Sequence, residues 1–311
     1  MRGGIGLLAR FPDARWRRAV TVALLAQVHP ARDILRAWLE HYRALGVAEF
    51  HLVLHGSPEQ AGLIDDVRGE YPIHIRGSYD GLFSERDKME RLGALLPELR
   101  GRWIFVVDDD EFVELPRRSL PDTLRGLERF GATAMAAPML QRMRADGSLE
   151  SPDVVPDPFC EFPLCSLDLY RLMGSRAATD KYPLMRCGDS TTITAGSHTP
   201  GNGFGSAASP LSGVTHHFKW RNEILRRLRT FIESKRIYPY WHESETYLSY
   251  LQDHDFRLPL NGAFPYSRRA LLARGLLDPG TFGSALRRGV GRGAAFVRRV
   301  ARAAKRRTLP T

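Results

Sequence analysis

Short apolar runs alternate with helical periodicity over the first hundred residues, and this alternation restricts the fold more than any other feature of the chain. The runs, which are apolar and β-branched as buried strands are, cover residues 20–28, 49–57, 71–78 and 103–107. Helical signals lie between them: Pro30 precedes an apolar stripe that Gly46 closes, and Ser84 can cap another helix together with Asp87. This order predicts an open, doubly wound α/β sheet that is mainly parallel, with helices on both faces.

The second half of the chain has looser periodicity, which predicts a mixed or antiparallel continuation of the sheet. Residues 214–220 are typical of a further strand, and Asn222 can cap the helix that follows. We therefore expect one α/β domain over 19–281, preceded by an extension at 1–18 and followed by a basic tail at 282–311.

The net charge of +10 belongs almost entirely to the end of the chain. Residues 268–307 hold twelve Arg or Lys and one acid, Asp278, so the remainder of the chain carries about −1. A nucleic-acid partner is therefore disfavoured for the body. Within 293–307 a shallow apolar face flanked by arginines could lie on an anionic membrane, with a disordered tail as the alternative.

Other features of the sequence point to a cytoplasmic protein, or one peripheral at the inner face of the membrane. No window approaches the roughly 18 apolar residues that a membrane span needs, and the apolar stretch near the start is too short for a secretory signal. The three cysteines show no CxxC spacing and read as buried thiols in a reducing compartment.

Four consecutive acids follow the apolar run "WIFVV", where a parallel strand would reach the carboxyl edge of the sheet. Carboxylates this close need protonation or a cation, and oxygen ligands suit Mg²⁺ or Mn²⁺. On an extended segment Asp108 and Asp110 point one way, whereas Asp109 and Glu111 point the other. The sequence thus predicts a metal–diphosphate site; a solvated turn, or a cap for a helix near Leu120, is the alternative.

Three segments resemble blocks of glycosyltransferase family 2-like proteins with a GT-A-type fold: "WIFVVDDDEFVEL", "RAWLEHYRALGV" and "VTHHFKWRNE". The resemblance spans about residues 20–236. It implies a nucleotide-sugar donor, a divalent metal on Asp108 and Asp110, a glycan, lipid-linked or other hydroxyl acceptor, and inversion at the anomeric carbon. The chain departs from these relatives at "AQVHP" and "HGSPE", where they would contact the base and the ribose of the nucleotide. The resemblance therefore does not predict which nucleotide sugar is the donor.

Histidines are candidates to complete the metal shell, since a neutral imidazole is a suitable ligand for Mn²⁺. The resemblance implies that one of His198, His216 and His217 reaches the metal, and we prefer His217. His216 and His217 face opposite sides of a strand, so at most one of them points into the site. The alternative for each is a half-buried structural histidine.

The remaining site residues are assigned by position and charge. Candidates for donor binding are Asp80, Arg86, Lys88, Asp108, Asp109 and Lys219. Candidates for catalysis are Asp110, Glu111, Glu161, Asp180 and Asp189, the last three as alternatives for the base that activates the acceptor. The sequence therefore predicts a metal-dependent glycosyltransferase; a metal-dependent phosphohydrolase and a non-catalytic nucleic-acid-binding protein acting through the tail are the alternatives.

Overall fold

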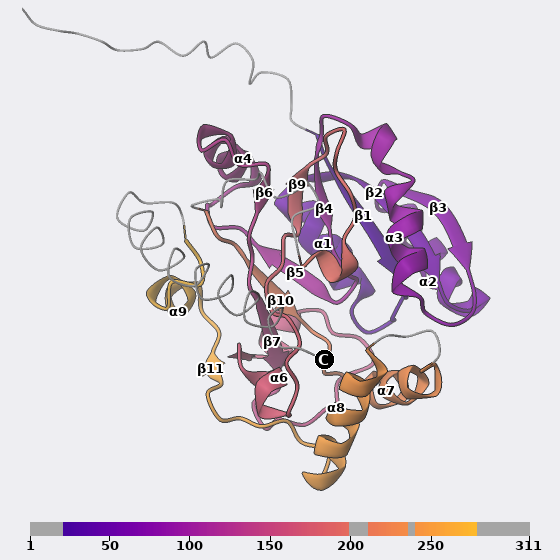
Figure 1. Cartoon of the computed structure of the whole chain (residues 1–311), viewed down its shortest axis with the longest axis vertical. Helices are drawn as coiled ribbons and strands as arrows, with labels where there is room; N and C mark the ends of the chain where they lie inside the picture. The colour runs from indigo at the N-terminus through magenta and orange to yellow at the C-terminus, as the bar shows by residue number, and fades with distance from the viewer. Residues whose placement is uncertain (1–20, 199–210, 236–239, 279–311) are drawn as a thin grey trace, which may run out of the picture.

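The computed structural model describes residues 21–198, 211–235 and 240–278, and within them the chain forms two sheets (Figure 1). The first sheet has the strand order β3-β2-β1-β4-β9-β6. Its strands are β1 (Val22–Val28), β2 (Val47–His55), β3 (Ile73–Tyr79), β4 (Trp103–Val106), β6 (Ala134–Met135) and β9 (Leu184–Arg186). β1 to β4 are parallel, whereas β9 pairs antiparallel with β4 and β6.

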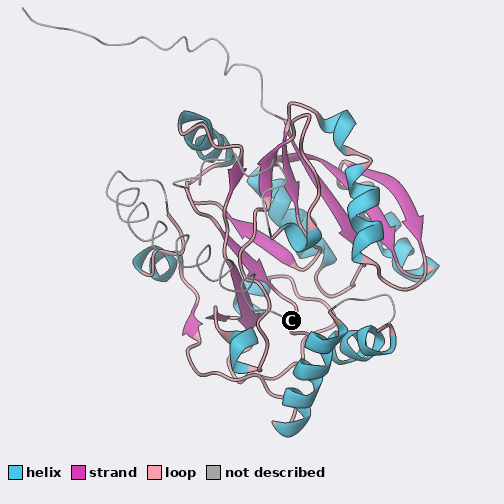
Figure 2. Ribbon diagram, viewed as in Figure 1, coloured by secondary structure: helices cyan, strands magenta, loops and turns pink. Residues whose placement is uncertain are grey.

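Helices cover both faces of this sheet, as predicted (Figure 2). Side chains of β1 alternate between the two resulting cores: Val22 and Leu24 join one, and Ala23 and Leu25 the other. The first core includes residues of α1 (Leu35–Leu45), α2 (Pro58–Arg68) and α4 (Leu120–Arg129). The second includes residues of α3 (Glu85–Gly93) and the 3-10 helix η2 (Leu96–Leu99).

The second half is mixed, as predicted, but only β6 and β9 continue the first sheet. The other later strands form a second sheet with the strand order β11-β8-β7-β10-β5. Its strands are β5 (Glu111–Glu114), β7 (Met139–Met143), β8 (Leu164–Ser166), β10 (Val214–His217) and β11 (Phe264–Pro265). The other helices are α5 (Pro158–Glu161), α6 (Leu169–Leu172), η3 (Ala195–Ser197), α7 (Ile224–Glu233), α8 (Trp241–Asp253) and α9 (Arg268–Ala273). Because β4 and β5 belong to different sheets, residues 107–110 cross from one sheet to the other.

Capping residues account for the end of α1 and for the start of α3. Gly46 ends α1 with a φ of +99°, the left-handed conformation that glycine adopts readily. The Ser84 hydroxyl accepts a hydrogen bond from the Asp87 N–H at the start of α3. However, α1 begins at Leu35 rather than near Pro30. Residues 32–34 form a turn in which the N–H groups of Ile34 and Leu35 donate to the Ala31 carbonyl.

The predicted cap of α7 was wrong. Asn222 exchanges two hydrogen bonds with the backbone of Ser151, so its side chain is not available to the first turn, and α7 begins at Ile224. No helix in the described ranges is both long and apolar enough to cross a bilayer. The predicted extension at 1–18 and the basic tail at 282–311 lie outside the described residues.

Candidate functional site

A cavity of about 390 Å³ opens at the carboxyl ends of the four parallel strands. The strand ends contribute side chains from three strands and the acidic turn: Gln27, His29, His55, Asp80, Asp108, Asp109 and Asp110. The rest of the lining comes mainly from α3, β10 and α7: Glu85, Lys88, His217, Lys219, Arg226, Arg227, Thr230 and Phe231. The acidic block therefore lies where α/β sheets bind ligands.

Two buried lysines neutralise one end of the acidic turn. The Lys88 Nζ lies 2.6 Å from Asp108 Oδ1, and the Lys181 Nζ lies 3.9 Å from Asp108 Oδ2 and 2.5 Å from Glu111 Oε1. Both lysines are less than 10% exposed. Burial alone would lower the lysine pKa values, but Asp108 and Glu85 raise that of Lys88, and Glu111 and Asp108 raise that of Lys181.

The next two aspartates have different partners. Asp110 Oδ1 lies 3.3 Å from His217 Nε2, and Asp110 Oδ2 lies 3.5 Å from Arg227 Nη1. Burial favours the protonated form of Asp110, but these two neighbours hold its pKa well below the ordinary value. Asp109 accepts a hydrogen bond from the His29 N–H at 2.7 Å, while burial and the charge of Asp110 raise its pKa to about 7.

The predicted alternation of the acids was wrong, because the extended chain ends before them. β4 stops at Val106, and the Glu111 N–H donates to the Asp108 carbonyl at 3.1 Å, which closes a turn. Consequently Asp109 lines the cavity together with Asp108 and Asp110, whereas Glu111 is buried against Lys181 and does not line it. The acids neither form a solvated turn nor cap α4, whose cap is Ser119.

The segments "AQVHP" and "HGSPE", in which the sequence departs from the resembled family, contribute to one wall of the cavity. The His29 Nδ1–H donates to the His55 carbonyl at 2.9 Å, and His29 Nε2 accepts from the Gln60 amide at 2.8 Å. Burial, and then Arg227, lower the pKa of His29 to about 4, so this ring is neutral. Gln60 also completes the capping box of α2 by accepting from the Ser57 N–H at 3.1 Å.

Aromatic rings gather beside this wall. The His55 ring stacks on Tyr79 with 4.7 Å between centroids, and its centroid lies 5.9 Å from that of Phe83. Phe83 lies 6.1 Å from Phe231 of α7. His55, Phe83 and Phe231 all line the cavity, which therefore offers flat surfaces for a planar ligand.

Lys219 is a basic side chain held by rings instead of carboxylates. Its Nζ lies 4.9, 5.3 and 5.6 Å from the ring centroids of Tyr247, Trp220 and Tyr170. No carboxylate of the described chain lies within ion-pair distance of it. Burial, followed by repulsion from Arg227, lowers the pKa of Lys219 to about 8.

Of the three candidate histidines, His217 alone lines the cavity. His216 faces the opposite side of β10, as predicted, where it contacts Glu114 at 3.1 Å and Arg142 at 3.3 Å. His198 lies outside the lining, and its Nδ1–H donates to the Asp180 carbonyl at 2.6 Å.

Several predicted residues are not brought to the cavity. Arg86 is exposed and pairs with Glu90 on the surface of α3 at 2.8 Å. Glu161 pairs with Arg144, and Asp180 is exposed. Asp189 lies beyond the opposite end of β4, because β9 runs antiparallel to that strand. By contrast, the structure brings together Asp80, Lys88, Asp108, Asp109, Asp110, His217 and Lys219.

Sequence reasoning missed the partners that these residues have in space. The missed lining residues include Gln27, His29, His55, Phe83, Glu85, Arg226 and Arg227, with Lys181 behind them. His29 and His55 lie at the carboxyl ends of predicted strands, and that position could have identified them as residues of the site. Nothing in the sequence around Lys181 indicates its pairing with Glu111.

The donor set does not fit a Mg²⁺ or Mn²⁺ site. Both Asp108 oxygens face ammonium groups, and Asp109 accepts from the His29 N–H. Asp110 and His217 are adjacent, but Arg227 lies beside Asp110. Within the described ranges no three His, Cys, Asp or Glu side chains are placed to hold a metal ion. The metal assigned to Asp108, Asp110, His217 and His198 stays a prediction.

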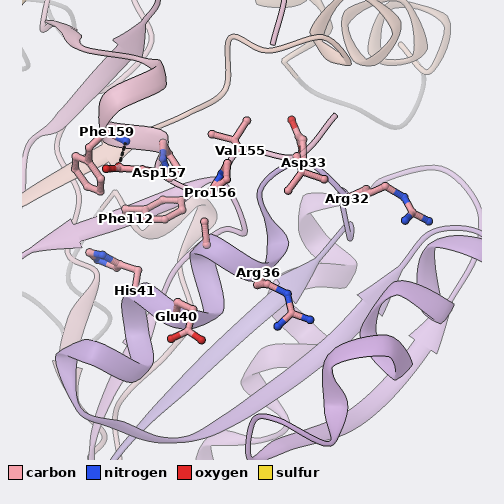
Figure 3. Close-up of a pocket in the computed structure, with 13 residues that line it drawn as sticks. Arg32, Asp33, Arg36, Glu40, His41, Phe112, Val155, Pro156, Asp157 and Phe159 are labelled. Atoms are coloured by element: carbon pink, nitrogen blue, oxygen red, sulfur yellow. Dashed lines mark hydrogen bonds between the residues drawn. The ribbon is translucent and has the colours of Figure 1, made fainter. Parts of the chain in front are cut away.

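A second cavity, of about 400 Å³, lies between α1 and residues 154–159 (Figure 3). Three of its charged side chains are already in ion pairs: Arg36 with Glu70, Asp33 with Arg221, and Glu40 with Arg43. It contains none of the acidic turn, so we do not assign the site to it.

Comparison with known proteins gives only distant matches. No protein-family model matches the sequence, and no curated protein is significantly similar to it. Among solved structures, S. aureus TarS 1-349 in complex with UDP-GlcNAc is 11% identical, with a TM-score of 0.35 over 75% of this chain and 72% of that chain. The 4-diphosphocytidyl-2C-methyl-D-erythritol synthase from Anaerococcus prevotii is 13% identical, with a TM-score of 0.26 over 44% of this chain and 64% of that chain. Similarity this low does not indicate which reaction this protein catalyses.

Proposed function

We propose that this protein is a glycosyltransferase that moves a sugar from a nucleoside-diphosphate-sugar donor to a hydroxyl group of an acceptor. The observation that carries the proposal is the composition of a single cavity at the carboxyl edge of the parallel strands. That cavity combines three buried or half-buried aspartates, basic side chains and an aromatic wall. The basic side chains are Lys88, Lys219, Arg226 and Arg227.

The proposed orientation of the donor follows from the distribution of charge. A diphosphate needs positive groups. Lys219, which follows β10, and Arg226 and Arg227 of α7 supply them. A nucleobase needs flat apolar surface, which His55 and Phe83 supply at the ends of β2 and β3. The sugar would then lie beside the acidic turn.

The chemistry requires stabilisation of the leaving group. When the bond between the anomeric carbon and the phosphate oxygen breaks, its electron pair stays on the nucleoside diphosphate, which gains negative charge. Basic side chains fixed before the reaction stabilise that charge without reorganising. The acceptor oxygen forms the new bond to the anomeric carbon and gives its proton to a base. We also propose that the transfer inverts the configuration of the anomeric carbon.

A thermal-shift screen tests this proposal. We expect at least one nucleoside diphosphate, and the corresponding nucleotide sugar, to raise the melting temperature, because a ligand that binds the folded state stabilises it. Release of nucleoside diphosphate that depends on an added acceptor would establish transfer, and NMR of the product would give its anomeric configuration. If no nucleotide stabilises the protein while phosphomonoesters are hydrolysed, the proposal is wrong.

No specific observation favours a phosphohydrolase. Such enzymes use a two-metal site with many oxygen and nitrogen ligands. The residues that the structure describes include no group of three such side chains placed around one position. The acceptor, whether a glycan or a lipid-linked molecule, is proposed from the sequence resemblance alone.

A further inference from the structure

The acids that line the cavity already have partners within the protein. Asp108 is paired with Lys88, Asp110 with His217 and Arg227, and Asp109 with the N–H of His29. Glu85 accepts from the Gly196 N–H at 2.8 Å and lies 3.9 Å from the Lys88 ammonium. The exposed Asp80 accepts from the Gly81 N–H. Asp108 and Asp110 therefore already have basic partners, whereas Asp80 and Asp109 accept only from backbone N–H groups.

One cation of this cavity, Lys219, has only distant carboxylates: Asp110 and Glu243 attract it from beyond ion-pair distance. Lys219 contacts three aromatic rings, but no carboxylate of the described residues lies within ion-pair distance of its Nζ. Rings attract an ammonium group but do not neutralise it. An anion near Lys219 would supply a close partner, whereas a divalent cation there would be repelled.

A metal at Asp108 would also disturb the buried lysines. It would compete for the Asp108 carboxylate with Lys88, which is 7% exposed. The displaced ammonium would keep only Glu85, 3.9 Å away, as a counter-ion in a buried place, which is unfavourable. Lys181 would keep its close pairing with Glu111 and lose only the more distant Asp108.

We infer that the site binds the donor diphosphate without a divalent metal. Lys88 and Lys181 balance the acidic turn, and Lys219, with Arg227 next to it, receives the phosphate charge. This inference rests on the proposed function, because it assigns how the same cavity holds a nucleoside diphosphate. It differs from the metal-bound arrangement that the sequence resemblance implies.

Calorimetric titrations of the full chain with UDP, GDP, ADP and CDP, each in EDTA and in Mn²⁺, test the inference. We expect the nucleotide that binds to do so with dissociation constants that agree within about twofold in the two buffers. Lys219→Gln should weaken binding about tenfold in both, because one charge-assisted hydrogen bond is lost. Arg86→Gln is the matched control: its side chain is exposed on α3 and outside the cavity, and binding should not change.

Each contrary result has a distinct meaning. Binding that requires Mn²⁺ overturns the inference and leaves the proposed function standing. Failure of every nucleotide to bind in either buffer overturns both. Binding in EDTA that Lys219→Gln does not weaken overturns the role of Lys219. If circular dichroism shows that Lys219→Gln does not fold, Arg227→Gln replaces it, with the same tenfold loss expected.

Discussion

The three aspartates at 108–110 share one turn but meet three different environments. Asp108 faces ammonium groups, Asp109 accepts from a backbone N–H, and Asp110 faces an imidazole and a guanidinium. Their pKa values diverge accordingly: burial and Asp110 raise that of Asp109 to about 7, while His217 and Arg227 lower that of Asp110 despite its burial. Neighbouring substitutions should therefore have unequal effects.

Asp110→Asn should reduce nucleotide release from the donor by about 10²-fold, because the neutral amide no longer fixes the charged Arg227 beside the leaving group. The steady-state rate with whichever nucleotide sugar binds is the measurement. Asp189→Asn is the control, since that exposed carboxylate pairs with Arg100 at the opposite end of β4. Equal rates for Asp110→Asn and Asp189→Asn would contradict the placement of the site.

His41 gives a prediction about acid stability. Its Nε2–H donates to the Val113 carbonyl at 3.0 Å, and burial lowers its pKa from 6.5 to about 4. Between these values the unfolded chain binds more protons, so the free energy of unfolding falls as the pH falls from about 6.5 to about 4. The His41 contribution is at most about 3 kcal/mol.

Urea unfolding of the wild type and His41→Gln at pH 7 and pH 4.5 measures that contribution. Glutamine can still donate to Val113 but does not titrate, so the variant should lose less stability than the wild type on acidification. Buried His29 and His216, whose pKa values are also lowered to about 4, are unchanged in both proteins. The same pH dependence in both proteins would show that His41 is not the source.

At the scale of elements, replacing glycine by alanine should lower the free energy of unfolding at a helix end and raise it inside a helix. Gly46→Ala places a Cβ at φ +99°, and the nearest atom is 3.9 Å away, so the cost of about 1–2 kcal/mol is conformational. Gly62→Ala lies within α2, where no atom comes within 4 Å of an added Cβ, and it should stabilise by about 0.5–1 kcal/mol. Denaturant midpoints measure both, and a shared sign would refute the distinction.

The elements themselves could be predicted because their signals are local. Most of the run "WIFVV" forms β4. Ser84 caps the start of α3 and Gly46 ends α1, as expected. Contacts between distant segments could not be predicted in this way. Asn222 carries the residue type of a cap but bonds to Ser151, and the lysine that balances Glu111 comes from far along the chain. Long-range pairs have no periodicity to reveal them.

The same limit applies to the candidate site. Its location at the carboxyl edge followed from the strand order, and seven of the predicted residues line one cavity. The orientation of Asp108 and Asp110 did not follow, because the rule for extended chains fails once β4 ends at Val106. The cations of α7 were missed because only the packing of that helix brings them to the acids.

At the scale of the whole molecule, charge is divided between two parts of the chain. Residues 268–307 carry twelve basic residues and one acid, whereas the remaining sequence is close to neutral. Attraction between basic side chains and anionic lipid is about 1 kcal/mol for each residue near the surface, and salt screens it. Any membrane attraction of this protein should therefore depend on the end of the chain and not on its body.

A charge-matched pair of variants tests that division. One variant replaces four tail arginines by glutamine: Arg298, Arg299, Arg302 and Arg306. The other replaces four exposed arginines of the body: Arg36, Arg86, Arg125 and Arg171. Both lose the same charge, so co-sedimentation with vesicles rich in phosphatidylglycerol should fall at least about tenfold for the tail variant only, and addition of salt should remove the difference. Equal losses would mean that net charge alone, and not its position at the end of the chain, governs membrane contact.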